Sequence, residues 1–120
     1  MRNLSLFFIL LICCEAKYIP EDGIYSVAET MPAYEQGMAA FDEFVNEEIE
    51  KWAPGEKANV FVSFVVKADG AVSDVKVVKG FSEAYDEKAK EIVSNCPGKW
   101  TAGTEEGQPV DVKMVYPVRF

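Results

Sequence analysis

The final residues of the chain alternate between apolar and more polar positions. Every even position from Val110 to Phe120 is apolar, and three of the five odd positions between them are charged. A period of two predicts a β-strand with one buried and one solvent-facing side. Because Pro117 has no amide donor, a strand hydrogen-bonded on both sides would accommodate it badly. We therefore expect this strand to lie at a sheet edge, where it can accept a further strand.

Two more strands are predicted in the middle of the chain. Residues 59–67 are apolar at every even position from 60 to 66 and carry further apolar residues between them, which is typical of a well-buried strand. Asp69-Gly70 predicts a tight hairpin turn in which both positions take positive φ. Residues 72–79 are then expected to return antiparallel to the first strand.

Two stretches have the period of an amphipathic helix. Between residues 37 and 52 the apolar face consists of Met38, Phe41, Val45, Ile49 and Trp52. Ser82 can cap the second helix, whose apolar face consists of Tyr85, Ala89, Ile92, Val93 and Cys96. The order helix, strand, strand, helix, strand predicts an α+β fold, with a three-stranded antiparallel sheet and both helices on one face. The last strand should pair beside the first, which leaves the second and the last strands as edges.

The remaining segments are expected to lack regular structure. Residues 17–34 contain Pro20, Gly23 and Pro32 without a sustained period, so they are interpreted as an extended lead-in. Residues 99–108 form a glycine-containing loop, which Trp100 is expected to anchor to the core. The alternative for Trp100 is stacking on a ligand.

The N-terminus predicts export. Arg2 precedes an apolar run of 11 residues, which is followed by small residues at Cys14 and Ala16. This pattern is typical of a secretory signal peptide cleaved after residue 16, and the run is shorter than the roughly 20 residues of a spanning helix. The alternatives are an uncleaved anchor and lipid modification at Cys13 or Cys14. Cleavage would leave Cys96 as the one cysteine, without a disulfide partner.

Composition narrows the range of functions. The net charge of −8 and the absence of histidine argue against nucleic-acid binding, against docking on anionic lipid and against the commonest catalytic bases and metal ligands. Residues 69–74 lack the ligand spacing of a calcium loop. No nucleophile motif or glycine-rich phosphate loop is visible, so we expect neither an enzyme nor a metal or cofactor site. The acidic residues between 42 and 50 are expected to form a solvated helix face.

Several short motifs follow one another in a characteristic order over residues 31–120. They are Met31-Pro32-Ala33-Tyr34 with Gly37-Met38, residues 60–66 with Asp69-Gly70, Asp86-Glu87-Lys88-Ala89, Trp100 to Gly103, Gly107-Gln108-Pro109-Val110, and Tyr116-Pro117-Val118-Arg119-Phe120. In this order the chain resembles the TonB C-terminal domain family, in its bacteroidete-like form. The resemblance predicts that the domain proper spans residues 35–120 and assigns structural roles to Asp69, Gly70, Trp100, Gly107 and Pro109.

The resemblance also implies a function. Domains of this family lie in the periplasm of Gram-negative bacteria and bind an extended segment of outer-membrane receptors, which adds as a strand to the sheet. On this chain the partner-binding edge would be the last strand, through Val110, Asp111, Lys113, Val115, Pro117 and Arg119. Backbone bonds would supply affinity, and side chains such as Lys113 and Arg119 would supply selectivity.

The chain departs from the family's full transducers in two respects. Those proteins have a spanning N-terminal helix and a long proline-rich spacer, and neither pattern is visible in this sequence. The expected function is therefore a periplasmic binding module linked to TonB-dependent transport. The alternative is an unpowered structural or self-associating protein, in which the same edge pairs with a second copy in a homodimer.

Overall fold

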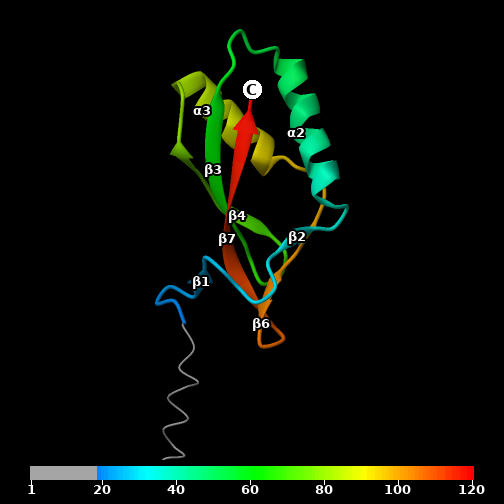
Figure 1. The fold of residues 1–120 in the computed structure, drawn as a ribbon, viewed down its shortest axis with the longest axis vertical. Helices are drawn as coiled ribbons and strands as arrows, with labels where there is room; N and C mark the ends of the chain where they lie inside the picture. Colours follow the sequence, from blue (N-terminus) through cyan, green and yellow to red (C-terminus); the bar gives the residue numbers. More distant parts are fainter. Residues whose placement is uncertain (1–18) are drawn as a thin grey trace, which may run out of the picture.

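The computed structural model describes residues 19–120, which form an α+β fold with two helices and seven strands (Figure 1). The helices are α2 (Met38–Trp52) and α3 (Glu83–Ser94). The strands are β1 (Ile24–Tyr25), β2 (Ala33–Tyr34), β3 (Asn59–Val66), β4 (Val72–Lys79), β5 (Trp100–Thr101), β6 (Gly103–Glu105) and β7 (Gln108–Arg119). The predicted signal peptide, with Cys13 and Cys14, lies outside the described residues.

The main sheet has the strand order β1-β7-β3-β4, and β6 also pairs with β7. β3 is antiparallel to both β4 and β7, which confirms the predicted hairpin and the predicted place of the last strand beside the first. β1, however, is parallel to β7, and β2 and β5 form a separate two-stranded sheet. The predicted three-stranded antiparallel sheet is therefore wrong in detail, because strands of two or three residues are too short to produce a readable alternation.

One face of the sheet and both helices enclose the core. The even-numbered side chains of β3 are at most 1 % exposed, and they face the apolar sides of the helices. Those sides consist of Phe41, Val45 and Ile49 on α2 and of Ala89, Ile92 and Val93 on α3. Both predicted helices are confirmed. Ser82 caps α3 by accepting a hydrogen bond from the amide of Tyr85 at 3.5 Å.

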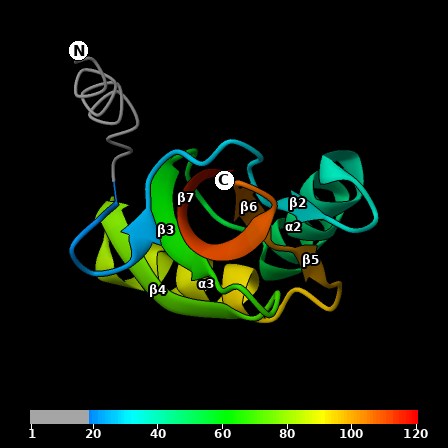
Figure 2. The same ribbon diagram turned by 90° about the horizontal axis from the view of Figure 1, so that it is seen from below.

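Two groups of aromatic rings hold the ends of this core. Around Trp100, which is 5 % exposed, lie Tyr34, Phe41 and Phe64, with ring centroids 5.4 Å from the Trp100 ring in each case. At the other end Trp52 and Tyr85 pack against the C-terminal Phe120 at 5.5 and 5.0 Å. The second group fixes the end of β7. Figure 2 shows that β3 and β7 are strongly curled.

The hairpin between β3 and β4 differs from the prediction at its turn. Gly70 has φ +88°, but Asp69 does not have a positive φ. The amide of Gly70 donates to the carbonyl of Lys67 at 2.8 Å, and the amide of Lys67 donates to the carbonyl of Ala71 at 2.7 Å. The loop therefore has three residues and a single left-handed position, as in a type I turn followed by a bulge.

No helix in the part of the chain from residue 19 to residue 120 combines the length and the apolar character needed to cross a bilayer.

Candidate functional site

β7 has two parts with different neighbours on the side away from β3. Residues 108–110 pair with β6, and along residues 111 and 112 the side away from β3 is paired with β1. Along residues 113–119 no strand among residues 19–120 pairs with it, although β3 continues on the other side up to Arg119. We call these parts the covered half and the open half. In Figure 1 the open half is the red end of β7, on the side of the sheet where α2 lies.

The backbone of the open half directs alternate residues outward. Ala58 and Phe120 exchange two hydrogen bonds, at 2.7 and 3.4 Å, and thus fix the phase of the β3–β7 ladder. In a regular antiparallel ladder every second pair is hydrogen-bonded, so the pairs at positions 118, 116 and 114 bond to β3. The amides and carbonyls of Lys113, Val115 and Arg119 therefore point away from β3. Pro117 belongs to the same outward set, where its missing N–H costs no bond to β3.

The helix side of the open half is closed by aromatic packing and one hydrogen bond. The Tyr116 ring stands at 83° to the Phe41 ring with centroids 4.7 Å apart, and the Tyr116 hydroxyl donates to Asp42 Oδ1 at 2.5 Å. Burial, reinforced by the Asp42 carboxylate, raises the pKa of Tyr116 well above its usual value. Between α2 and this part of β7 lies a shallow cleft of about 270 Å³, lined by Asp42, Val45, Asn46, Tyr116, Pro117 and Arg119.

The other face of the open half is accessible and carries cations. Val115 is 53 % exposed, and Lys113 and Arg119 are both exposed. Neither of these two basic side chains forms an ion pair with a carboxylate of residues 19–120. An added strand would therefore meet an unpaired lysine near one end of the open half and an arginine at the other.

The covered half corrects part of the predicted binding edge. Val110 pairs with Gly103 of β6, and Asp111 pairs with Ile24 of β1. The backbones of both residues are thus paired within the chain, so these two residues do not belong to an open edge as predicted. The sequence did not predict the pairing of Val110 and Asp111, because Pro117 indicates an unpaired outer side only at its own position and not several residues earlier in the strand.

Asp111 also fastens the β3–β4 hairpin to β7. Its carboxylate accepts a hydrogen bond from the amide of Ala68 at 2.8 Å and pairs with the Lys67 ammonium at 3.1 Å. The Ala68 amide and the Lys67 ammonium lower the pKa of Asp111 against the opposing effect of burial, and the same carboxylate raises the pKa of Lys67. Asp111 is thus a structural carboxylate at the boundary between the halves.

The residues predicted to be structural are placed around the covered half. Gly70 allows the hairpin tip to reach β5, because a Cβ there would lie 2.6 Å from the carbonyl oxygen of Trp100. Asp69 Oδ1 accepts a hydrogen bond from the amide of Ala71 at 2.9 Å. Gly107 has φ +78° in the β6–β7 turn, and Pro109 pairs with Thr104 of β6.

The lead-in contributes attachments that were not predicted. Thr30 and Thr104 exchange backbone hydrogen bonds at 3.1 and 2.9 Å. The amide of Glu29 donates to Glu105 Oε1, and the amide of Glu106 donates to Glu29 Oε1, both at 2.9 Å. Such long-range contacts have no local sequence signal. They place residues 28–30 firmly beside β6.

The lone described cysteine is part of the packing. Cys96 is half-buried, lies against the core, and its Sγ donates to the Tyr34 hydroxyl at 3.1 Å. Among residues 19–120 no group of three or more histidine, cysteine, aspartate or glutamate side chains is arranged to hold a metal ion. The features that single out a site are thus an open backbone edge and its flanking side chains.

Comparison with protein families gives this edge a context. A family model described as Gram-negative bacterial TonB protein C-terminal matches residues 51–120, more than half of the chain. The chain belongs to this family. The matched part begins at the end of α2 and includes β3, β4, α3 and the whole of β7. Searches of curated proteins and of solved structures found no match.

The predicted family is therefore confirmed, while its bacteroidete-like form stays a prediction. TonB C-terminal domains are periplasmic in Gram-negative bacteria, interact with outer-membrane receptors and are non-enzymatic modules associated with transport. The chain is thus a TonB-like protein-interaction domain.

Proposed function

We propose that the open half of β7 captures an extended peptide segment of an outer-membrane receptor by strand addition, in support of TonB-dependent transport. The observation that carries the proposal is the outward row of amides and carbonyls along residues 113–119, which no strand of the described chain occupies. An unpaired edge of this kind is a ready template for another chain. The proposal includes export by cleavage after residue 16, which would bring the domain to the periplasm.

The flanking side chains support selectivity. On the accessible face an incoming strand would place every second side chain beside Lys113, Val115 or Arg119, of which the two cations are not ion-paired within residues 19–120. On the helix side the alternate side chains would enter the cleft beside Asp42 and Asn46. The two faces thus present different side chains to a docked strand, and they would favour one register over a slip of one residue.

The proposal is tested with synthetic peptides from the N-terminal segments of outer-membrane receptors, titrated by calorimetry against the mature protein. Strand addition predicts that only alternate peptide amides donate to β7. We therefore expect N-methylation at residues of one parity to abolish binding of a bound peptide, and N-methylation at the other parity to leave its affinity within about twofold. Equal sensitivity at both parities, or no binding by any peptide to the folded domain, would contradict the proposal.

A matched pair of protein variants locates the edge. Val115→Pro removes one outward donor of the open half without removing a bond to β3, and it should weaken peptide binding about tenfold or more. Val77→Pro makes the same change on β4, at the opposite edge of the sheet, because Val77 pairs with Val62, whose backbone bonds to β7, and the Val77 amide therefore points away from β3. It should leave binding unchanged. Circular dichroism checks that both variants fold.

Sedimentation separates receptor capture from the alternative of self-association. If the edge binds a receptor segment, we expect the protein alone to sediment as a monomer at all concentrations. A homodimer that the Val115→Pro variant abolishes would instead assign the edge to a second copy of the chain.

A further inference from the structure

A segment of the chain itself already pairs with β7 where the open half begins. β1 runs parallel to β7, with Ile24 opposite Asp111 and Tyr25 opposite Val112. Asp111 has the same parity as Lys113 and Val115, so the backbone groups that β1 meets belong to the same outward row. After Tyr25 the chain turns away, and no other strand of residues 19–120 continues the pairing along this row. β1 and the open half are therefore two consecutive parts of one docking edge.

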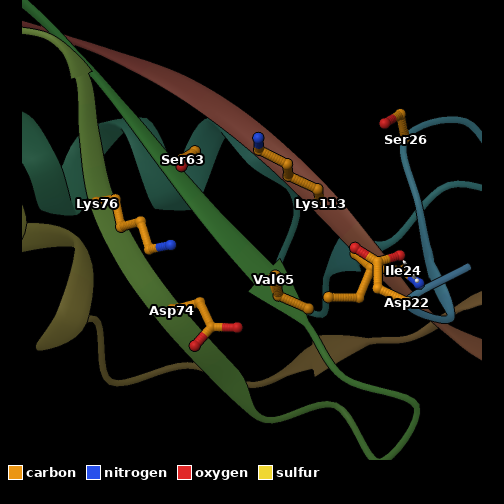
Figure 3. Close-up of a pocket in the computed structure, with 8 residues that line it drawn as sticks. All are labelled: Asp22, Ile24, Ser26, Ser63, Val65, Asp74, Lys76 and Lys113. Atoms are coloured by element: carbon orange, nitrogen blue, oxygen red, sulfur yellow. Dashed lines mark hydrogen bonds between the residues drawn. The ribbon is translucent and has the colours of Figure 1, made fainter.

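The side chains around β1 fill one end of a hollow on the helix-free face of the sheet. The hollow has a volume of about 330 Å³ and is lined by Asp22, Ile24, Ser26, Ser63, Val65, Asp74, Lys76 and Lys113 (Figure 3). The first three are alternate residues of the lead-in, as expected when one side of an extended strand faces a surface. The lead-in thus shows how alternate side chains of an added strand reach this hollow.

The other end of the hollow contains polar groups that have no partner among residues 19–120. Ser63 is 3 % exposed and lies between Lys76 and Lys113 in Figure 3. No hydrogen bond of its hydroxyl with the described residues is seen, and neither lysine forms an ion pair with them. Two ammonium groups and a hydroxyl together suit a carboxylate.

β1 is held much more weakly than the segment that follows it. It has two paired residues, both half-buried, and it lies between Ile19 and Val27, which are 73 % and 76 % exposed. Residues 28–34, by contrast, are fixed by the Thr30–Thr104 hydrogen bonds, by the Glu29 contacts and by β2. Residues 19–27 can therefore leave β7 while the rest of the lead-in stays in place.

We propose that β1 is an internal substitute for the partner strand, which occupies the first part of the docking edge and its hollow until a receptor segment displaces it. The proposal rests on the proposed function and adds a competitor and a preferred partner chemistry to it. The displacing segment runs parallel to β7 and places an aliphatic residue at the Ile24 position. Two residues later it places an acidic residue, level with Lys113 and facing Ser63.

The decisive experiment locks β1 in place. A disulfide between Ile24→Cys and Asp111→Cys, in a Cys96→Ala background, joins two residues that are neighbours across the strand pair. The probe is any receptor peptide that binds the wild-type domain, and the reduced form of the same variant is the matched control. We expect the oxidised form to bind at least about tenfold more weakly than the reduced form, and reduction to restore affinity.

A second pair of variants works in the opposite direction and needs no crosslink. Ile24→Lys loosens β1 and should raise the affinity of the peptide severalfold, while Val27→Lys adds the same charge outside β1 and the hollow and should not. Replacing the acidic residue of the peptide by its amide should lower the affinity for wild type and have no effect on a Lys113→Ala variant.

The outcomes separate the two proposals. Equal binding by oxidised and reduced forms, together with no effect of Ile24→Lys, would overturn the substitute strand and leave receptor capture intact. Absence of binding by wild type and by every variant would overturn receptor capture and the substitute strand with it.

Discussion

The covered and open halves of β7 are alike in their side chains and different in their backbone partners. Each half sends a fully buried valine into the core, Val112 in the covered half and Val118 in the open half, both with 0 % exposure. β3 pairs with the whole open half and, in the covered half, with Val112. Within residues 19–120, only the covered half has further strand partners, β6 at residues 108–110 and β1 on the outer side of residues 111 and 112. Burial of side chains and pairing of the backbone are therefore set independently, and a strand can be central at one end and an edge at the other.

The largest effect on stability is expected from the packing between α2 and the open half, which lacks an outer strand within the described chain. Phe41 is completely buried, and its ring lies 4.7 Å from that of Tyr116 and 5.4 Å from that of Trp100. We expect Phe41→Ala to lower the free energy of unfolding by about 3–5 kcal/mol, because it removes a large core side chain. Urea denaturation followed by circular dichroism measures the change.

Met38→Ala is the control on the same helix, since Met38 is 42 % exposed. Its effect should stay within about 0.5 kcal/mol. A loss below about 1 kcal/mol for Phe41→Ala would mean that the open half does not depend on the helix side for its stability.

The comparison also shows how far the sequence alone leads. The helices, the β3–β4 hairpin and the long strand β7 were predictable, because each has enough residues for its period to be read. The strands β1, β2, β5 and β6 have two or three residues and were missed. Their positions depend on contacts between distant segments, such as Thr30 with Thr104. Residues 113–119 therefore remain the predicted docking edge, whereas Val110 and Asp111 are excluded from it by their partners in β6 and β1.

The turns teach the same lesson at a smaller scale. The sequence suggested a two-residue turn with two positive φ angles at Asp69-Gly70, yet Asp69 does not have a positive φ. That turn occurs instead at Glu106-Gly107, where φ is +53° and +78° between β6 and β7. Both Asp69-Gly70 and Glu106-Gly107 have glycine at the second position. The register of the flanking strands therefore decides which of the two loops is a two-residue turn.

The second test addresses the covered half. A Cβ at Gly103 would lie 2.7 Å from the carbonyl oxygen of Thr30 and 2.8 Å from Cγ2 of Val112. Gly103→Ala should therefore lower the free energy of unfolding by about 1–3 kcal/mol through overpacking. It should also speed amide exchange in β6 and β1 more than along residues 113–119. Gly55→Ala, where no atom lies within 4 Å, is the matched control and should be nearly neutral. Uniformly faster exchange along β7 would show that the halves are one cooperative unit.

The third test uses the hydroxyl that ties the open half to α2. Tyr116→Phe removes the hydrogen bond to Asp42 and should lower the free energy of unfolding by about 1 kcal/mol at neutral pH. Because the pKa of Tyr116 is raised in the folded state, its contribution is fully present below about pH 10 and is lost as the pH rises further. The variant should thus lose stability less steeply than wild type above about pH 10. Parallel alkaline curves for the two proteins would contradict this role.

The smallest effect is expected at the boundary between the halves, from Asp111→Asn. The Asp111 side chain is 25 % exposed, so solvent screens its pairing with Lys67, and the amide oxygen of asparagine can still accept from Ala68. We expect a loss of about 0.5 kcal/mol at neutral pH. The pKa of Asp111 is lowered on folding, so its contribution is present above the unfolded value of 3.8 and disappears as the pH falls through the folded value. Wild-type and variant unfolding curves should therefore converge between about pH 4 and pH 2. A difference that persists at about pH 2 would show that Asp111 acts through packing, and then β1 would be expected to loosen along with the hairpin.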